Sequence, residues 1–306
     1  MTDFAAVREL RPYLREPEAM RVGMPGKSGY LRLGFERDAA GRTILRDWER
    51  RAPLIVQQAL YFDEELPGMP CIYILSSGGP NVDGDRYEQL VELKTGAMAH
   101  ITTGAATKLA SMRYNFSALR QRFRLDEEAY AEYLPEPVIP CARTRFWSET
   151  VLEVAPTATL VYAETYLSGR RFHGNERYAY DLLSVTTRIR RPGGAPLYNE
   201  KWLVEPGRRT PLQRGMLHDY EVFANVLVLT PPRHADAVRE RTASFRSETQ
   251  RLACGVLRLP GEAGLCCRVA GDSSEAVRQA VRHFCSVVRQ EVKGRPLPSE
   301  FPWRAI

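Results

Sequence analysis

Residues 145–154 read Arg-Phe-Trp-Ser-Glu-Thr-Val-Leu-Glu-Val, and this stretch decides the class of fold. Its even-numbered residues, which include Phe146 and Leu152, fall on one face of an extended chain, and its odd-numbered residues, which include Glu149 and Glu153, fall on the other. A period of two with apolar side chains on one face is typical of a half-buried strand. The stretch therefore predicts a β-strand.

Runs of the same kind extend on both sides of this stretch, over most of the chain from Tyr30 to Pro206. They cover residues 31–35, 54–62, 71–75, 87–93, 98–103, 114–125, 159–166 and 178–189. Turn sequences such as Gly78-Gly79-Pro80-Asn81 and Pro192-Gly193-Gly194 separate many of them. Many short strands without helices between them predict a mainly antiparallel or coiled β architecture.

The last third of the chain has a different pattern. Residues 231–250 are polar and helical in pattern, and residues 274–293 form an amphipathic helix followed by Gly294. Between them, residues 254–259 and 265–269 have the pattern of strands. Because no linker divides the chain, we expect a single domain over residues 1–306, strand-rich over 28–206 and helix-containing over 207–306.

Composition indicates a soluble globular protein. The 306 residues are 44% hydrophobic and 26% charged, and the net charge of +6 arises from 43 basic and 37 acidic residues mixed along the chain. The six cysteines form no CxxC pair, so we interpret them as small buried residues in a reducing compartment. The charged first 21 residues and the lack of an uncharged apolar run of ~20 residues favour a cytoplasmic protein.

Two small-residue segments have a functional and a structural interpretation. Residues 77–85 resemble a phosphate-binding loop, but they lack its lysine and are followed by a strand pattern, so we expect a tight turn with Asp85 accepting local backbone amides. Residues 102–108 place Lys108 beside threonines, as an activated nucleophile would require. No base accompanies it, so a solvated lysine is the favoured interpretation.

Carboxylates within apolar surroundings are candidates for a polar site. Glu132 and Glu136 flank Tyr133-Leu134-Pro135, and Glu164 shares a strand face with apolar residues. A buried carboxylate needs a counter-charge, hydrogen bonds or a metal ion. For Glu164, the common explanation is a pair with Arg170 or Arg145, and the more specific one is a polar channel that carries a divalent cation.

Enzymatic and nucleic-acid-binding functions remain as alternatives. A strand-rich cytosolic hydrolase would use Glu164 or Asp85 as its acid or base, although GxSxG and HExxH motifs are absent. A nucleic-acid-binding module would use the basic patch of Arg120, Arg122 and Arg124. The five histidines show no HxH, HExxH or Cys/His spacing, so the sequence does not predict a permanent zinc site.

An ordered set of short motifs along the chain resembles the UreD family of urease accessory proteins, also called UreH. The motifs are Gly29-Tyr30-Leu31-Arg32-Leu33, residues 53–58 with Tyr61, Gly78-Gly79 with Gly84-Asp85, Thr102-Thr103 to Thr107-Lys108, residues 132–135 with Ile139-Pro140, Gly169-Arg170 before Glu176-Arg177, Gly264-Leu265 with Arg268-Val269, Arg295-Pro296 and Pro302-Trp303-Arg304. Each motif alone is weak, but together they span nearly the whole chain in order.

The resemblance implies a mainly β, β-helix-like fold with a few helices, two of them in the C-terminal third. It also implies a urease maturation chaperone without catalytic activity, which assists nickel insertion together with UreF, UreG and apo-urease and has no nucleic-acid or membrane partner. No cofactor is expected to bind tightly, and Ni²⁺ would make transient contacts only. The matching positions give the candidate nickel-passage residues Asp85, Glu132, Glu164 and Glu176, and the candidate structural or interface residues Gly78, Gly79, Gly84, Thr103, Lys108, Pro135, Gly169 and Arg170.

Overall fold

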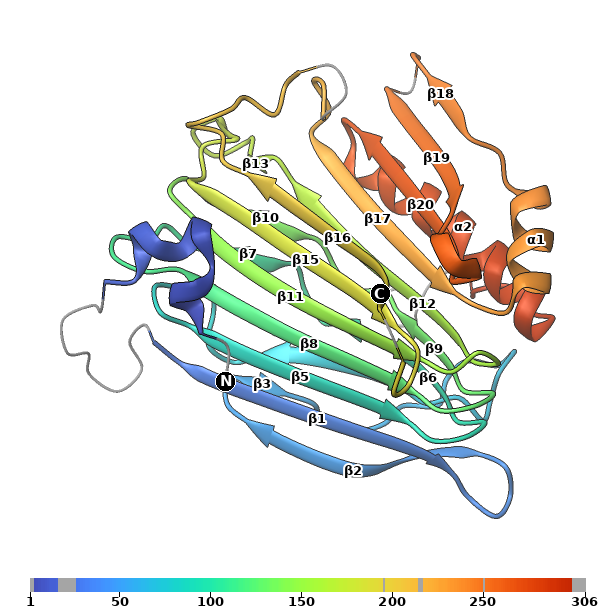
Figure 1. Cartoon of the computed structure of the whole chain (residues 1–306). Helices are drawn as coiled ribbons and strands as arrows, with labels where there is room; N and C mark the ends of the chain where they lie inside the picture. The colour runs from blue at the N-terminus through green and yellow to red at the C-terminus, as the bar shows by residue number, and fades with distance from the viewer. Residues whose placement is uncertain (1–2, 16–25, 195, 214–216, 250, 299–306) are drawn as a thin grey trace.

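Two large β-sheets face each other across a shared apolar core in the computed structural model, which describes residues 3–15, 26–194, 196–213, 217–249 and 251–298 (Figure 1). The first sheet has the order β16 (Pro196–Val204), β15 (Leu182–Arg190), β11 (Arg145–Val154), β8 (Ser117–Leu125), β5 (Arg86–Leu93), β1 (Ser28–Arg37) and β2 (Thr43–Arg51). We call it the seven-stranded sheet.

The second sheet, which we call the eleven-stranded sheet, follows the order β18 (Phe245–Ser247), β19 (Leu252–Arg258), β20 (Gly264–Gly271), β17 (Val222–Leu229), β12 (Thr159–Leu167), β9 (Tyr130–Tyr133), β6 (Met98–Thr103), β4 (Cys71–Ser76) and β3 (Leu54–Ile55). The short strands β7 (Thr107–Leu109) and β10 (Val138–Pro140) join it at one side, where β10 pairs with β12 and β7. A separate pair consists of β13 (Gly169–Arg170) and β14 (Glu176–Arg177).

The central strands of both sheets are parallel because the chain winds as a coil and enters the sheets alternately. In the seven-stranded sheet, β1, β5, β8, β11 and β15 pair in parallel in chain order. In the eleven-stranded sheet, β4, β6, β9 and β12 do the same. Each turn of the coil thus adds one strand to each sheet, which confirms the predicted strand-rich, β-helix-like fold.

Antiparallel strands close the coil at both ends. β2 pairs antiparallel with β1 at one edge, and β16 pairs antiparallel with β15 at the other. In the eleven-stranded sheet, β17, β20 and β19 continue from β12 in antiparallel order. The strands predicted at residues 254–259 and 265–269 are confirmed as β19 and β20.

The alternation in β11 works as its sequence predicts. Phe146, Leu152 and Val154 are at most 2% exposed, and Leu152 and Val154 belong to the core between the sheets. The odd-numbered carboxylates Glu149 and Glu153 lie on the outer face and pair with arginines of β15. One face of the strand therefore supplies the core, and the other supplies a charged surface.

Two α-helices cover the outer face of the eleven-stranded sheet (Figure 1). Helix α2 (Ser274–Lys293) begins where the Ser273 hydroxyl accepts a hydrogen bond from Ala276 N, and it ends at Gly294, whose φ is +72°. Its buried stripe, which includes Val277, Phe284 and Val288, packs on the sheet. No helix within the described ranges is long and apolar enough to span a membrane.

The helix predicted over residues 231–250 is shorter than expected. Helix α1 (Pro232–Arg241) ends at Thr242, whose backbone is extended, and Phe245–Ser247 then forms β18 against β19. Tertiary pairing with a neighbouring strand overrides the local helical pattern here. The described residues also contain the 3₁₀ segments η1 (Phe4–Ala6), η2 (Arg8–Tyr13) and η3 (Pro260–Glu262). That the whole chain forms one domain stays a prediction.

Candidate functional site

A row of polar side chains crosses the inner face of the seven-stranded sheet, and each member is paired in register with the next one on the adjacent strand. Five neighbouring strands contribute to it, and the paired residues, from β5 to β16, are Gln89, Gln121, Thr150, Thr187 and Glu200. Each stands two residues from an apolar core residue of its own strand, as Gln121 does from Phe123, so all five face the space between the sheets. We call this set the polar row.

Tyrosines of the eleven-stranded sheet contact the polar row from the opposite side. The Gln121 amide donates hydrogen bonds to Gln89 Oε1 and to the Tyr133 hydroxyl, both at 2.9 Å. The Tyr162 hydroxyl lies 3.0 Å from both Gln121 Oε1 and Thr150 Oγ1. Polar groups from both sheets thus form one hydrogen-bonded layer inside an otherwise apolar core.

Glu164 on β12 is the acidic member of this layer. The hydroxyls of Tyr162 and Tyr166 donate to its Oε1 at 2.9 and 3.1 Å. The pKa of Glu164 is raised to about 7 in total: burial raises it most, the two tyrosine hydrogen bonds lower it, and the charge of Glu200 also raises it. This carboxyl group therefore changes its charge near neutral pH.

Of the two explanations offered for Glu164, the pair with Arg170 or Arg145 is wrong. Arg145 pairs with Asp181, with 2.9 Å between Nε and Oδ2, and Arg170 pairs with Glu176. Within the described part of the chain, no basic side chain forms an ion pair with Glu164; its partners are tyrosine hydroxyls.

An ion pair terminates the polar row at the β16 end. Arg268 on β20 bonds to Glu200 Oε1, and the Asn225 amide donates to Glu200 Oε2 at 3.2 Å. The Cys266 thiol in turn donates to Asn225 Oδ1 at 3.2 Å. Glu164, Asn225 and Arg268 lie directly opposite one another on the three adjacent strands β12, β17 and β20.

Cavities lie at both ends of the layer. Gln89 lines a cavity of about 430 Å³ together with Gly79, Thr103 and Lys108. Arg268 lines a second cavity of about 590 Å³, with Trp202 of β16 and Phe223 of β17 in its wall. The polar row thus extends from Gln89, which lines one cavity, to Glu200, whose ion-pair partner Arg268 lines the other.

Asp85 is fully buried in the turn before β5 and does not belong to the layer. It accepts hydrogen bonds from the backbone N–H groups of Gly26, Lys27 and Val82 at 3.1, 2.9 and 3.0 Å, and the Lys27 ammonium lies 2.9 Å away. The predicted bonds to local backbone amides are confirmed, and they tie two loops together.

The glycines of this turn have the backbone role that the sequence predicts. Gly79 and Gly84 have φ values of +68° and +75°, which side chains rarely adopt. Gly78 has an ordinary φ, but a Cβ there would lie 2.8 Å from Pro53 Cβ, which is closer than packing allows.

Glu132 lies on the opposite face of the eleven-stranded sheet, beneath α2. Its Oε2 is 2.7 Å from His100 Nδ1, and Arg289 Nε of α2 is 3.6 Å from its Oε1. Burial alone would raise the pKa of Glu132, but the hydrogen bond from His100 and the charges of His100 and Arg289 lower it below its usual value. The sheet backbone separates Glu132 from the polar row.

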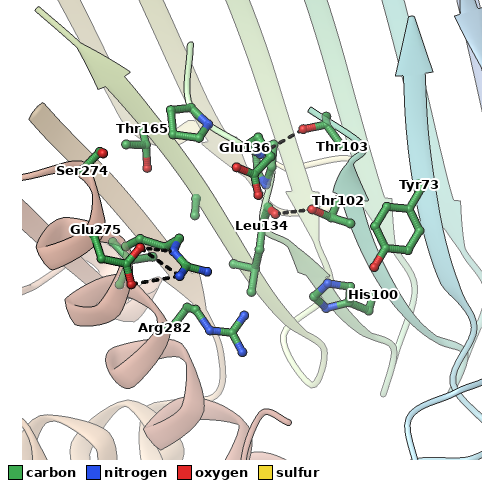
Figure 2. A pocket seen from close by; sticks show the side chains of 16 residues that line it. Tyr73, His100, Thr102, Thr103, Leu134, Glu136, Thr165, Ser274, Glu275 and Arg282 are labelled. Carbon is green, nitrogen blue, oxygen red and sulfur yellow. Dashed lines mark hydrogen bonds and ion pairs between the residues drawn. The ribbon is translucent and has the colours of Figure 1, made fainter. Parts of the chain in front are cut away.

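His100 lines a cavity of about 380 Å³ between β6 and the first turns of α2 (Figure 2). Thr102 donates to Leu134 O at 2.7 Å, and Glu136 N donates to Thr103 Oγ1 at 2.9 Å, as the dashed lines in Figure 2 show. Pro135 also lines this cavity. Leu134 and Pro135 of this motif therefore form part of the cavity wall on the helix side of the sheet.

Glu176 forms a bidentate pair with Arg170, with distances of 2.7 and 2.6 Å to Nε and Nη2, and accepts Ala142 N at 3.0 Å. Arg170 lowers the pKa of Glu176 below its usual value. Gly169 has a φ of +146°, and a Cβ there would lie 1.9 Å from Glu176 O, so only glycine fits. Lys108 is exposed near this pair, and both line a cavity of about 400 Å³.

Of the four candidate carboxylates, the structure places only Glu164 between the two sheets. Asp85, Glu132 and Glu176 occupy three separate places, each with its own partners. Sequence reasoning missed Gln89, Gln121, Thr150, Glu200 and Arg268. A usable signal was present, because Gln121 interrupts the apolar face formed by Leu119 and Phe123.

The arginines of β8 form a surface of mixed charge. Arg120 lies 2.9 Å from Glu88 of β5, and Arg124 lies 3.9 Å from Glu153 of β11. Alternating charges of this kind do not favour nucleic acid binding. Among the described residues, no group of three His, Cys, Asp or Glu side chains is placed to hold a metal ion.

Comparisons with known proteins agree with one another over nearly the whole chain. The family model described as UreD urease accessory protein matches residues 27–304. Urease accessory protein UreD 3 of Methylorubrum populi is 45% identical over 97% of this chain and 96% of its own length. Urease accessory protein UreD 2 of Brucella ovis is 42% identical over 97% of this chain and 98% of its own length. Urease accessory protein UreD 2 of Methylorubrum extorquens is 44% identical over 98% of this chain and 96% of its own length.

Proposed function

The chain belongs to the UreD family of urease accessory proteins and acts in urease maturation, and we propose that it does so by giving nickel a protected passage to apo-urease. The polar layer between the two cavities supports this proposal. It offers oxygen atoms of amides, hydroxyls and two carboxylates across a core that is otherwise apolar.

The chemistry of these groups suits transport of an ion better than its storage. Ni²⁺ binds tightly to imidazole and thiolate, whereas carboxylate and amide oxygens hold it weakly. Glu164, with a pKa of about 7, is charged in part of the molecules at neutral pH and becomes fully charged when a cation approaches. Weak, adjustable ligands let a cation move on to the next site.

In the isolated chain, the members of the layer hydrogen-bond to one another. A passing cation would replace these bonds, so Gln121 would exchange its contact with Tyr162 for a contact with the ion or with its bound water. The passage is then closed to water at rest and opens around its cargo.

The proposal includes partners and place of action. The chain has no phosphate-binding loop, so we propose that the GTPase UreG supplies the energy and that the chain works in the cytoplasm in a complex with UreF, UreG and apo-urease. We propose no catalytic activity for the chain itself. It should therefore hydrolyse neither GTP nor model esters when it is purified.

The passage is tested by Glu164→Gln combined with Glu200→Gln in cells that express the whole urease gene cluster. Both changes keep the shape of the side chain and remove its charge. We expect at least a severalfold loss of nickel in purified urease while the complex with UreF forms normally. The matched control is Glu88→Gln on the outer face of the same sheet, which should leave urease nickel unchanged. Normal nickel content in the double variant would refute the passage.

A further inference from the structure

The ion pair between Arg268 and Glu200 places a permanently charged guanidinium group at the end of the polar layer. Two strands from different sheets supply the pair, β20 of the eleven-stranded sheet and β16 of the seven-stranded sheet. The Glu200 side chain is 11% exposed, so its carboxylate is largely removed from water. The guanidinium group thus occupies the position where a cation would bind this carboxylate.

We infer that Arg268 is a built-in counter-cation, which prevents Glu200 and Glu164 from retaining a passing divalent cation and gives way when one arrives. This inference rests on the proposed function, because it assigns a regulatory role to the end of the same passage. It predicts a property of the purified chain that can be measured without urease.

The two carboxylates are close enough to act together. The charge of Glu200 raises the pKa of Glu164, which indicates electrostatic repulsion between the two carboxylates. Asn225 lies opposite Glu164 on the neighbouring strand and donates to Glu200, which links the two groups in space. Without Arg268, the carboxylates of Glu200 and Glu164 would be left as hard oxygen ligands for a divalent cation.

The structure also leaves Arg268 a place to move. Its Nε atom is buried and has no hydrogen-bond partner in the described structure, so only the bonds of its terminal nitrogens hold it. Gly255 lies directly opposite on β19, and a Cβ there would have no atom within 4 Å. Since Arg268 also lines the 590 Å³ cavity, its guanidinium group can leave Glu200 and remain hydrated.

The test measures Ni²⁺ affinity of the purified full chain by calorimetry, with Co²⁺ as a second probe. Arg268→Met keeps the apolar stem and removes the charge, and we expect it to bind Ni²⁺ roughly tenfold more tightly than the natural chain. Arg268→Lys keeps the charge and should bind as weakly as the natural chain. The control Arg278→Met removes an arginine of similar exposure that is paired with Glu275 on α2, and it should change nothing.

A second variant identifies the ligand. Arg268→Met combined with Glu200→Gln should return the affinity to that of the natural chain. Unchanged affinity in Arg268→Met would overturn the inference, and so would tight binding that survives the loss of Glu200. If Arg268→Met does not fold, Arg268→Gln removes the same charge from a side chain that stays polar, and the same outcomes apply.

The inference and the proposed function can fail separately. Normal urease nickel in the Glu164→Gln and Glu200→Gln double variant would refute the passage, even if Arg268→Met still binds Ni²⁺ tightly. Conversely, a loss of urease nickel in that double variant, together with unchanged affinity in Arg268→Met, would keep the passage and overturn the role of Arg268.

Discussion

At the scale of single residues, Glu164 couples stability to pH. Its folded pKa of about 7 lies above the ordinary value of 4.5, so the folded chain keeps a proton that the unfolded chain releases. The free energy of unfolding should therefore fall as pH rises from about 4.5 to about 7 and stay level above that.

Glu164→Gln should remove this dependence. The amide oxygen can still accept from Tyr162 and Tyr166, so the variant should match the natural chain near pH 4.5 and exceed it by on the order of 3 kcal/mol above pH 7. Urea unfolding at several pH values measures the difference. Glu149→Gln, which changes a paired carboxylate on the outer face, serves as control. Parallel profiles for Glu164→Gln and the natural chain would contradict the expectation.

Asp85 is a second residue with a predictable effect, because its buried carboxylate accepts three backbone bonds and pairs with Lys27. Asp85→Asn should cost roughly 3 kcal/mol of unfolding free energy, since one amide oxygen cannot replace both carboxylate oxygens and Lys27 loses its partner. Chemical denaturation measures this. Asp38→Asn changes an exposed turn aspartate that accepts Ala40 N and Arg42 N, so its cost should be clearly smaller. Equal costs would show that burial of Asp85 does not matter.

At the scale of elements, a buried arginine fixes α2 to the sheet. Arg289 is fully buried, bonds to Asp63 and lies 3.6 Å from Glu132. Arg289→Met should destabilise the chain by about 3 to 5 kcal/mol, because two buried carboxylates lose their counter-charge. Adding Asp63→Asn should recover part of this loss in a double-mutant cycle. Arg278→Met on the exposed side of the same helix is the control. A mild effect of Arg289→Met would mean that apolar packing alone holds the helix.

The elements also show what the sequence could predict. Alternation located most of the strands of the coil, but it missed β2, β16 and β17, and it misplaced strand ends. β17 could not be found in this way because all eight of its residues are buried, so it has no polar face. The run predicted at residues 178–189 starts too early, since Tyr178 has a φ of +52° and β15 begins at Leu182. A left-handed turn residue with an apolar side chain carries no signal in the pattern.

The contacts that join the members of the polar layer could not be predicted from the sequence, although one member, Gln121, carries a signal. Glu200 and Arg268 meet because β16 and β20 belong to two facing sheets, and nothing in the local sequence of either strand indicates that contact. The sequence identified Glu164 as a candidate site residue because the rest of its strand face is apolar. Gln121 interrupts an apolar strand face in the sequence, but its contact with Gln89 follows only from the register of β5 and β8.

At the scale of the whole molecule, exposed apolar side chains are what we expect of a protein that functions within a complex. Leu257 is 56% exposed and Phe245 is 45% exposed on the last strands of the eleven-stranded sheet. We expect the isolated chain to be poorly soluble and its soluble fraction to rise severalfold when UreF is co-expressed, because binding covers such surface. Fractionation of lysates with and without UreF checks this. A soluble monomer that elutes apart from UreF in size-exclusion chromatography would count against it.

The coiled path of the chain also sets the order in which the contacts of the polar layer can form during synthesis on the ribosome. Gln89 can bond to Gln121, which lies 32 residues later in the chain, only after a full turn of the coil has emerged. Glu200 can bond to Arg268 only after a further 68 residues have emerged. At ~5 to 20 residues per second, each turn takes a few seconds to appear, which is long compared with strand pairing. We expect the passage to be assembled from its Gln89 end and closed by Arg268 last. Nascent chains stalled with residues 1–200 outside the ribosome should already resist protease over β1 to β12; uniform cleavage would show that the coil forms only after release.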